Sequence, residues 1–326
     1  MAGITAAFTD LADRVRRGER RAIARALTLV ENGGDDAQAL LALLHPDTGR
    51  AHLVGVTGAP GTGKSTLANA VAGEYRHRGR QVGIIAVDPT SPYTGGAILG
   101  DRIRMQSHHG DPGVFIRSMA TRGHLGGLAV ATTDAVRVLD AAGFNPIMIE
   151  TVGAGQSEVE IAGAAHTTLV VQAPGLGDDI QAIKAGILEI ADIFVVNKAD
   201  MPGADQAVAA LRAMLMLGAR ERGQRQRETG IPPWALPIEE TVASVGKGIP
   251  PLVDKIEEHA AYLERTGQRF LLERDRAESQ VRDILRAWLL RDRLAALPEG
   301  ELGRVAARVA ERQVDPYTAA EELLAG

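Results

Sequence analysis

The residues best suited to chemistry occupy one short segment between an apolar run and an apolar helix. The pattern G-x-x-x-x-G-K-[ST] is matched in full by Gly58-Ala59-Pro60-Gly61-Thr62-Gly63-Lys64-Ser65, and Thr66 follows. Glycines let backbone N–H groups converge on a phosphate, and the start of the next helix adds a favourable field. In this pattern Lys64 reaches the β- and γ-phosphates and Ser65 ligates Mg²⁺. The segment predicts a nucleoside triphosphate site, and the alternative is a glycine-rich turn that binds nothing.

A second motif, Asn197-Lys198-Ala199-Asp200, ends a later apolar run and concerns the base. A carboxylate at Asp200 can accept from N1–H and the C2 amine of guanine, whereas adenine offers an acceptor at N1 and no C2 amine. Asn197 would serve O6 and N7, and the Lys198 stem would lie along the base. Such a site rejects the wrong base by roughly 10⁴ or more, because buried polar groups are left unpaired. The motif predicts GTP.

Candidate metal ligands end or follow three other segments. Asp88 ends an apolar run, Asp101 follows a glycine-rich loop, and Glu150 precedes Thr151-Val152-Gly153, where a D-x-x-G motif would carry Asp instead. Mg²⁺ prefers an octahedral shell of carboxylate, water and phosphate oxygens. We therefore expect Asp88, Asp101 and Glu150 to join Ser65 at a magnesium ion, directly or through water. For Asp88 and Asp101 the alternative is N-cap or turn chemistry.

The groups expected to promote hydrolysis are incomplete. Gly153 can donate its N–H to the γ-phosphate and act as a switch, but Ala154 stands where Ras-like enzymes place glutamine. A group supplied by a partner is typically worth roughly 10³–10⁵ in rate for such enzymes. We therefore expect slow intrinsic hydrolysis that a partner accelerates. Lys184 is a candidate stabiliser of the transition state, and the alternative is a surface lysine.

The elements that must position these residues follow an α/β rhythm. Near-continuous apolar runs alternate with helix-length segments, which is typical of a parallel sheet covered on both faces. Ligands of such sheets lie beyond the carboxyl ends of the strands, where the polar motifs cluster. The prediction is a P-loop NTPase fold with helical extensions at both ends. The expected strands lie within 52–58, 81–89, 114–119, 145–151, 167–174, 193–200 and 234–243.

The two ends of the chain are expected to be helical. We expect residues 1–50 to form an N-terminal helical extension, 51–250 the nucleotide-binding domain, and 251–326 a C-terminal helical region. Asp315-Pro316 predicts the start of the last helix. An apolar stripe through Val281, Leu285 and Trp288 suits either a subunit interface or packing on the chain's own domain.

Composition limits the class of protein. The 326 residues contain 36 Lys+Arg against 41 Asp+Glu, giving a net charge of −5, and no cysteine. The mildly acidic balance argues against a general nucleic-acid binder, and the absence of cysteine excludes disulfides and thiolate chemistry. No apolar run reaches the ~20 residues of a membrane span. The start of the chain has acids at Asp10, Asp13 and Glu19 and lacks the uninterrupted apolar core of a signal peptide. We expect a soluble cytoplasmic protein without nucleic-acid or membrane partners.

Taken together, the motifs resemble the MeaB/ArgK family of G proteins. The resemblance covers nearly the whole chain and rests on the segments GAPGTGKST, VDPTSP, GDRIRM, ETVGAGQSE, PGLGDDIQAIKAG, VNKAD and TVAS-x-GKG. One departure is the guanine-backing signature S-A-x-x-G-x-G, which begins here with Val242 and Ala243. The backbone N–H of Ala243 can still serve the base, so only a side-chain hydroxyl is lost.

The resemblance implies a GTP-hydrolysing chaperone of methylmalonyl-CoA mutase or a related adenosylcobalamin-dependent mutase. Such a protein gates delivery of adenosylcobalamin and protects the mutase from inactivation, without binding cobalamin itself. The resemblance also implies a homodimer built through the C-terminal helices, which makes 251–326 a dimerisation region. It further implies a cobalamin adenosyltransferase as a candidate partner, and switches at 88–101, 150–158 and 177–188. Asp178, Gln181 and Lys184 belong to the third switch.

Two other functions fit parts of the sequence. One is a kinase or ATPase linked to amino-acid transport, a label long attached to this family, although Asp200 argues against ATP. The other is a GTPase that delivers nickel, which normally needs a Cys/His cluster. This chain has no cysteine and eight scattered histidines, so its ligand chemistry does not favour a metal carrier.

Overall fold

The computed structural model of the chain describes residues 2–89, 110–121, 127–151, 163–175, 190–217 and 231–325. Within these ranges seven strands form one sheet in the order β3-β2-β4-β1-β5-β6-β7, and all neighbouring strands are parallel. The predicted P-loop NTPase fold is confirmed, and each expected strand is present. The strands are β1 (Leu53–Thr57), β2 (Val82–Pro89), β3 (Val114–Thr121), β4 (Ile147–Thr151), β5 (Thr167–Gln172), β6 (Ile193–Asn197) and β7 (Ile238–Thr241).

The sheet is buried on both faces. Successive side chains of a strand point to opposite faces, and in β2 Ile84 and Ala86 join one hydrophobic cluster while Ile85 and Val87 join another. Because both sets are buried, the strand is apolar without a break instead of alternating with polar residues.

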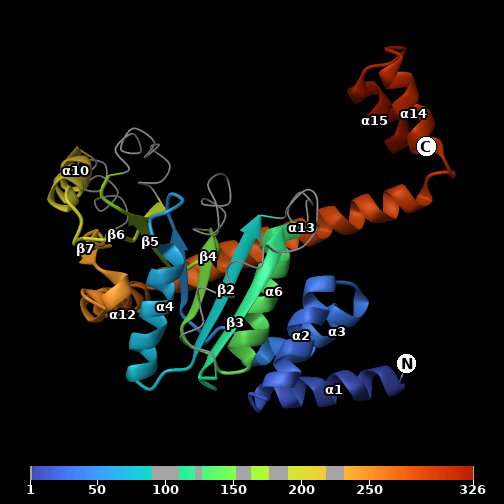
Figure 1. Ribbon diagram of the computed structural model, residues 1–326. Helices are drawn as coiled ribbons and strands as arrows, with labels where there is room; N and C mark the ends of the chain where they lie inside the picture. Colours follow the sequence, from blue (N-terminus) through green and yellow to red (C-terminus); the bar gives the residue numbers. More distant parts are fainter. Residues whose placement is uncertain are drawn as a thin grey trace. The chain divides into compact units, whose positions relative to one another are not determined.

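Helices cover the two faces (Figure 1). One face is covered by α4 (Lys64–His77) and α12 (Ile249–Thr266), whose buried residues share a cluster with β1 and β5. The opposite face is covered by α6 (Gly127–Ala141) and, over β6, by α10 (Ala204–Leu217). Residues at the carboxyl ends of the strands therefore stay at an edge that these helices flank.

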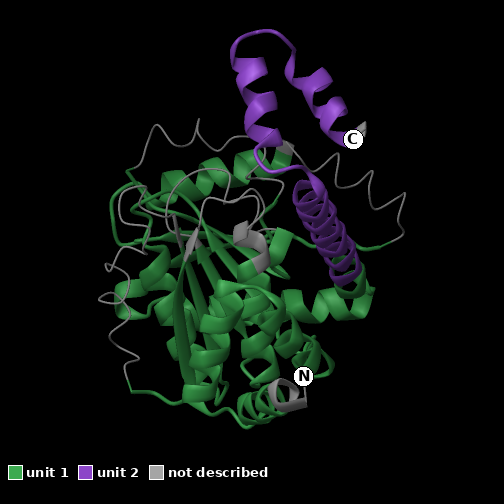
Figure 2. Ribbon diagram, turned by 90° about the vertical axis from the view of Figure 1, so that its right-hand side faces the viewer, with its two compact units in different colours: residues 1–272 green, residues 273–326 purple. Residues whose placement is uncertain are grey.

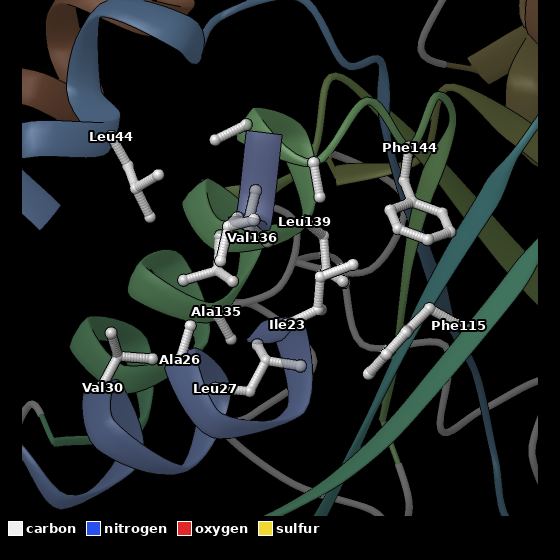
Figure 3. Close-up of a cluster of buried hydrophobic side chains, with 14 of the residues drawn as sticks. Ile23, Ala26, Leu27, Val30, Leu44, Phe115, Ala135, Val136, Leu139 and Phe144 are labelled. Atoms are coloured by element: carbon white, nitrogen blue, oxygen red, sulfur yellow. The ribbon is translucent and has the colours of Figure 1, made fainter. Parts of the chain in front are cut away.

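The N-terminal helices belong to the same core as the sheet. They are α1 (Ala2–Arg16), α2 (Arg20–Asn32) and α3 (Asp35–Leu44). Figure 3 shows Ile23 and Leu27 of α2 beside Val136 and Leu139 of α6, and all four side chains are buried. The predicted helices of the first 50 residues are therefore present, and their apolar faces pack on the sheet layer through α6.

A buried polar network closes the amino-terminal edge of the sheet. The Thr167 hydroxyl, at the start of β5, lies 2.7 Å from His52 Nε2 and 2.8 Å from His259 Nδ1. His259 Nε2 lies 3.5 Å from the Asp192 carboxylate, and the Trp234 ring centroid is 4.8 Å from that of His259. These contacts join α12 to β5 and to the start of β6.

A second polar cluster at this edge holds the segment that leads into β1. The Asp140 carboxylate accepts from the Gly49 N–H at 2.6 Å and from the Ala51 N–H at 2.9 Å. Arg269 donates to the carbonyl oxygens of the same two residues, at 2.9 and 3.2 Å. The backbone N–H and C=O groups of Gly49 and Ala51 therefore all have side-chain partners.

The chain divides into two compact units, residues 1–272 and 273–326 (Figure 2). The second unit contains most of α13 (Gln268–Ala296), with α14 (Glu301–Ala310) and α15 (Pro316–Ala325). As predicted, Asp315 caps the last helix, because its carboxylate accepts from the N–H groups of Tyr317 and Thr318 at 2.9 and 3.1 Å. The functional boundaries expected at residues 50 and 250 stay a prediction.

The apolar stripe of α13 is exposed in the second unit. Val281, Leu285 and Trp288 have 57%, 50% and 43% of their surface accessible. The choice between a subunit interface and intramolecular packing stays a prediction. None of the helices in the described ranges is long and apolar enough to cross a membrane.

Candidate functional site

The predicted phosphate loop follows β1, the central strand of the sheet, and leads directly into α4 (Figure 1). Two of its glycines pass too close to neighbouring elements for any side chain. A Cβ on Gly58 would lie 2.1 Å from the Val171 carbonyl oxygen, and one on Gly63 would lie 2.5 Å from Asn197 Nδ2. Both also have positive φ angles, of 138° and 90°, which only glycine adopts at little cost.

Side chains bind the carbonyl oxygens of this loop. Lys64 Nζ donates to Gly58 O at 2.6 Å, Lys198 Nζ to Gly61 O at 2.8 Å, and Asn197 Nδ2 to Thr62 O at 2.9 Å. In a trans peptide unit the N–H points away from the C=O. Holding these carbonyls against the protein therefore turns N–H groups such as that of Gly63 the other way. This is the arrangement that an anion-binding loop requires.

Lys64 and Ser65 begin α4 and are both buried. Besides Gly58 O, the Lys64 ammonium contacts Ala59 O at 3.1 Å. A phosphate oxygen in the loop would be a stronger partner than these neutral carbonyls, because its negative charge attracts the positive charge of the ammonium. Lys64 thus lies where it can exchange loop carbonyls for phosphate.

Ser65 and Glu150 form the part of the predicted metal site that the structure describes. The Ser65 hydroxyl donates to Glu150 Oε1, and Glu150 is only 1% exposed. The contact arises because β4 pairs with β1, which brings the end of β4 beside the phosphate loop. A hydroxyl and a carboxylate together are oxygen donors of the kind that Mg²⁺ accepts, so these two residues fit the ion.

The rest of the predicted metal site is not described. The backbone of Asp88 lies near the end of β2, but its side chain and all of Asp101 are outside the described residues. Within the described ranges no group of three or more His, Asp or Glu side chains could hold a metal ion. Asp88 and Asp101 therefore stay predicted ligands.

Asn197 connects the two motifs. Its Nδ2 donates to Thr62 O, and its Oδ1 accepts from the Thr241 hydroxyl and from the Ala243 N–H, both at 3.1 Å. The side chain is 2% exposed. Asn197 thus ties the phosphate loop to the loop after β7, and only the second hydrogen of Nδ2 is left for the expected contact with the base.

Lys198 and Asp200 lie at the carboxyl end of β6. Lys198 has φ of 57°, a left-handed conformation that is uncommon for a side-chain-bearing residue. This conformation accompanies the contact of its ammonium with Gly61 O, which extends the lysine stem across the phosphate loop. Asp200 is exposed at the same edge, where its carboxylate is accessible to a ligand.

The loop after β7 contains Val242 and Ala243, which the sequence predicts beside the base. The Ala243 N–H is buried and donates to Asn197 Oδ1 in this structure, and its contact with the base stays a prediction. The Val242 N–H likewise donates to Lys247 O at 2.9 Å. Both residues therefore help to position Asn197 and the loop, and their own amides are engaged within the protein.

A family model described as "Methylmalonyl Co-A mutase-associated GTPase MeaB" matches residues 23–297. The chain belongs to the MeaB family. A putative GTPase of Pyrococcus abyssi is 50% identical over 315 residues, which cover 97% of this chain and 95% of that protein. A probable GTPase of Mycobacterium tuberculosis strain H37Rv is 41% identical over 323 residues, covering 96% and 93%. The resemblance inferred from the motifs is therefore confirmed.

A solved structure titled "LAO/AO transport system kinase" aligns with a TM-score of 0.68 at 24% identity, covering 98% of this chain and 96% of that one. At this identity the likeness shows the fold alone. It agrees with the arrangement of helices and parallel strands described above.

The groups expected to promote hydrolysis in this MeaB-family chain are Gly153, Asp178, Gln181 and Lys184. All four lie outside the described residues. Their roles stay predictions.

One residue of the site was missed by sequence reasoning. Thr241 ends β7, is fully buried, and donates its hydroxyl to Asn197 Oδ1. Its signal in the sequence is a polar β-branched residue that ends an edge strand directly before Val242. That signal becomes specific only once β7 is known to lie beside β6, where Asn197 and Thr241 are paired in register.

Proposed function

We propose that this MeaB-family chain binds GTP with Mg²⁺ at the carboxyl edge of its sheet and hydrolyses it slowly, as a chaperone of methylmalonyl-CoA mutase or a related adenosylcobalamin-dependent mutase. The observation that carries the nucleotide part is the loop 58–63, whose carbonyls are held by Lys64, Lys198 and Asn197. The same asparagine links the loop to Thr241 and Ala243 at the end of β7, beside the expected position of the base. Phosphate and base recognition thus share one hydrogen-bonded framework.

The proposed metal ligands are Ser65, Glu150, Asp88 and Asp101. A bound Mg²⁺ would neutralise charge on the β- and γ-phosphates. The contribution of the chain is the Ser65–Glu150 contact beside the first turn of α4, which holds two oxygen donors together before any ion arrives. Glu150→Gln should weaken the magnesium dependence of nucleotide binding, whereas Glu74→Gln, in the last turns of α4, should leave it unchanged.

Calorimetry with GTP and ATP, in the presence of Mg²⁺, tests the nucleotide assignment. We expect tight binding of GTP and GDP and no measurable binding of ATP. Tight ATP binding would instead support the kinase or ATPase alternative. Absence of heat with any guanosine nucleotide, on folded protein, would contradict the proposal.

The mutase part rests on the family description and on the resemblance of the motifs. Turnover of GTP should rise when an adenosylcobalamin-dependent mutase from the same organism is added. Lys184→Ala should reduce the stimulated rate and leave the GTP affinity nearly intact, whereas Lys255→Ala serves as a matched control. An unchanged stimulated rate in Lys184→Ala would make Lys184 a surface residue and would leave Asp178 and Gln181 as the candidates to test next.

We further propose that the chain forms a homodimer through its C-terminal helices. The exposed apolar residues Val281, Leu285 and Trp288 support this, since a stripe of large apolar side chains on a soluble helix normally packs against another surface. Leu285→Glu should lower the mass measured by sedimentation to that of a monomer. A wild-type chain that sediments as a monomer would contradict this part alone.

A further inference from the structure

A groove runs along the outer side of the N-terminal helices. Its volume is about 720 Å³, and its described walls come from α1, α2 and the first turn of α3. Residues 22, 23, 26, 27 and 30 of α2 face the core, so the groove lies on the opposite face of this helix. Most of its walls are apolar, and the apolar side chains are Ala7, Phe8, Leu11, Ala24 and Leu29.

The face of α2 along this groove combines small and charged side chains. Residues three and four positions apart are neighbours on a helix surface, so 21, 24, 25, 28 and 32 form one stripe. In its middle are Ala24 and Thr28, whose small size leaves the space of the groove. The Thr28 hydroxyl donates to Ala24 O at 3.0 Å, so its hydrogen is used within the helix. The charge of this face therefore comes from Arg21 and Arg25.

These two arginines differ from the others nearby because they have no partner. Arg21 and Arg25 are exposed, and neither forms a hydrogen bond or an ion pair with any residue that the structure describes. They lie one turn apart, and Arg25 lines the groove. By contrast, the neighbouring arginines are bound: Arg14 and Arg17 by Glu19 at 2.7 and 3.0 Å, Arg16 by Asp47 at 2.7 Å, and Arg20 by Val114 O at 2.9 Å.

The other end of the groove has the opposite charge. Asp36, in the first turn of α3, lines the groove and is exposed. It too is without a hydrogen-bond or ion-pair partner among the described residues. Because Asp36 follows the end of α2, whereas Arg21 and Arg25 are in its first half, the groove is positive at one end and negative at the other.

We propose that this groove binds an amphipathic helix of a second protein, with two carboxylates one turn apart in its N-terminal half and a basic residue near its C-terminal end. The apolar face of that helix covers the apolar walls, its carboxylates reach Arg21 and Arg25, and its basic residue reaches Asp36. This charge order also suits the dipole of the bound helix itself. Between Ala24 and Asn32, α2 rises about 12 Å, which gives room for about two turns.

The charges favour a helix over other ligands. An anionic membrane or a nucleic acid would bring negative charge to Asp36 as well as to the arginines, whereas a helix can carry different side chains at its two ends. The groove is also separate from the nucleotide site. Helices α1 to α3 share a core with α6, on the opposite face of the sheet from α4 (Figure 1). The proposal therefore does not depend on GTP binding.

Selection from a library of designed helices tests the proposal. Each peptide has about 14 residues, enough to form a helix, with one apolar face and with Glu, Gln or Lys at random in the flanking positions. The full-length chain is the target, and Ala24→Trp, which fills the groove, serves for counter-selection. Enriched peptides should carry two Glu one turn apart in their first half and Lys near their end. Enrichment of another pattern, or of no peptide, would overturn the proposal.

Reversal of one charge then tests the contact with Arg25. Arg25→Glu should weaken binding of the enriched peptides by roughly 5- to 10-fold, because like charges are brought together, and peptides with Lys in place of Glu should recover it. Arg212→Glu reverses an exposed arginine of α10, outside the groove, and should bind as wild type does. Equal affinities of Arg25→Glu and wild type would contradict the assignment. If circular dichroism shows Ala24→Trp to be unfolded, Arg25→Glu replaces it in the counter-selection.

Two further measurements distinguish this occupant from the alternatives. The exposed residues Tyr317, Glu321 and Leu324 share one face of α15, so a second copy of the chain has a helix of similar chemistry. Arg25→Glu should sediment with the mass of wild type, and a lower mass would assign the groove to a second copy and overturn the proposal. Vesicles of phosphatidylglycerol should bind neither protein. Vesicle binding by wild type that Arg25→Glu loses would assign the groove to a membrane and would equally overturn it.

Discussion

The two edges of the sheet contain similar kinds of polar residues and treat them in opposite ways. At the amino-terminal edge, Thr167 joins His52 and His259, and Asp140 binds two backbone amides, so the polar groups satisfy one another. At the carboxyl edge, side chains bind the carbonyls of the phosphate loop, while Asp200 and Ser244 stay exposed. Polarity alone therefore does not mark a site; what matters is which hydrogen-bonding groups the fold leaves available.

The difference follows from the direction of the strands. In a parallel sheet all carboxyl ends lie at one edge, where loops lead into the N-termini of helices and their N–H groups. At the other edge, helices return to the sheet, and buried polar groups there must find partners because leaving one unpaired costs about 1–3 kcal/mol. Variants at the carboxyl edge should change ligand binding, and variants at the amino edge should change stability.

Asp200→Asn should have the largest effect of these variants. The property that it changes should be the selectivity of the site between guanine and xanthine nucleotides. The amide donates where the carboxylate accepted, which suits the C2 carbonyl of xanthine instead of the amine of guanine. The ratio of GTP to XTP affinities should shift by roughly 10³–10⁴-fold, as measured by competitive binding. Asp205→Asn, an exposed acid in the first turn of α10, should leave the ratio unchanged; an unaltered ratio in Asp200→Asn would contradict the base assignment.

Lys64→Ala should weaken GTP binding by about 10²-fold, because a charged hydrogen-bond partner of the phosphates is lost. The free energy of unfolding without nucleotide should change by less than the binding free energy, since the variant no longer has to bury a charged ammonium. Titration calorimetry and urea unfolding measure the two quantities. Lys255→Ala, whose ammonium pairs with Glu258 at 2.7 Å on α12, is the control; a wild-type affinity in Lys64→Ala would remove the phosphate-loop assignment.

Asp140→Ala should act in the opposite sense, lowering the free energy of unfolding by about 3 kcal/mol and sparing the affinity for GTP. The N–H groups of Gly49 and Ala51 lose their acceptor in a half-buried segment. Asp134→Ala, on the same helix, loses only an ion pair with Arg137 at 3.2 Å and should cost about 1 kcal/mol or less. An equal loss of unfolding free energy in Asp140→Ala and Asp134→Ala would mean that the unpaired N–H groups of Gly49 and Ala51 do not cause the loss.

The smallest effect is expected from the pH dependence of the histidine network. Burial lowers the pKa of His259 to about 4. An unfolded histidine has a pKa of about 6.5, so between these values the unfolded chain binds a proton that the folded chain does not. The contribution of neutral His259 is therefore fully present above about pH 6.5 and falls by at most about 1.4 kcal/mol per pH unit below it.

Urea unfolding of wild type and His259→Gln between pH 7 and 5 measures this effect. The stability difference between the two proteins should shrink as the pH falls, because only wild type carries the titrating imidazole. His77→Gln, whose side chain is 85% exposed, should follow wild type at every pH. A difference that stays constant would mean that His259 does not titrate in this window.

Much of the fold could be predicted from the sequence. Apolar runs such as 193–196 are buried on both faces and therefore show no alternation, which indicates parallel strands without knowledge of their order. The phosphate loop could be found because its chemistry needs fixed residue types at fixed spacing. The hydrogen-bond partners within the site could not be predicted, because they are far apart in the sequence. Asn197 and Thr62, for example, are 135 residues apart.

The sequence by itself determined the fold class and the phosphate loop, and it predicted the acidic residue for the base, because each depends on local periodicity or contiguous spacing. The tertiary structure decided that Asn197 hydrogen-bonds to the phosphate loop, to Thr241 and to the Ala243 amide. Those facts depend on β6 lying beside β7 and on the end of β4 lying beside the phosphate loop. Strand order is set by packing of the whole sheet, and no short stretch of residues encodes it.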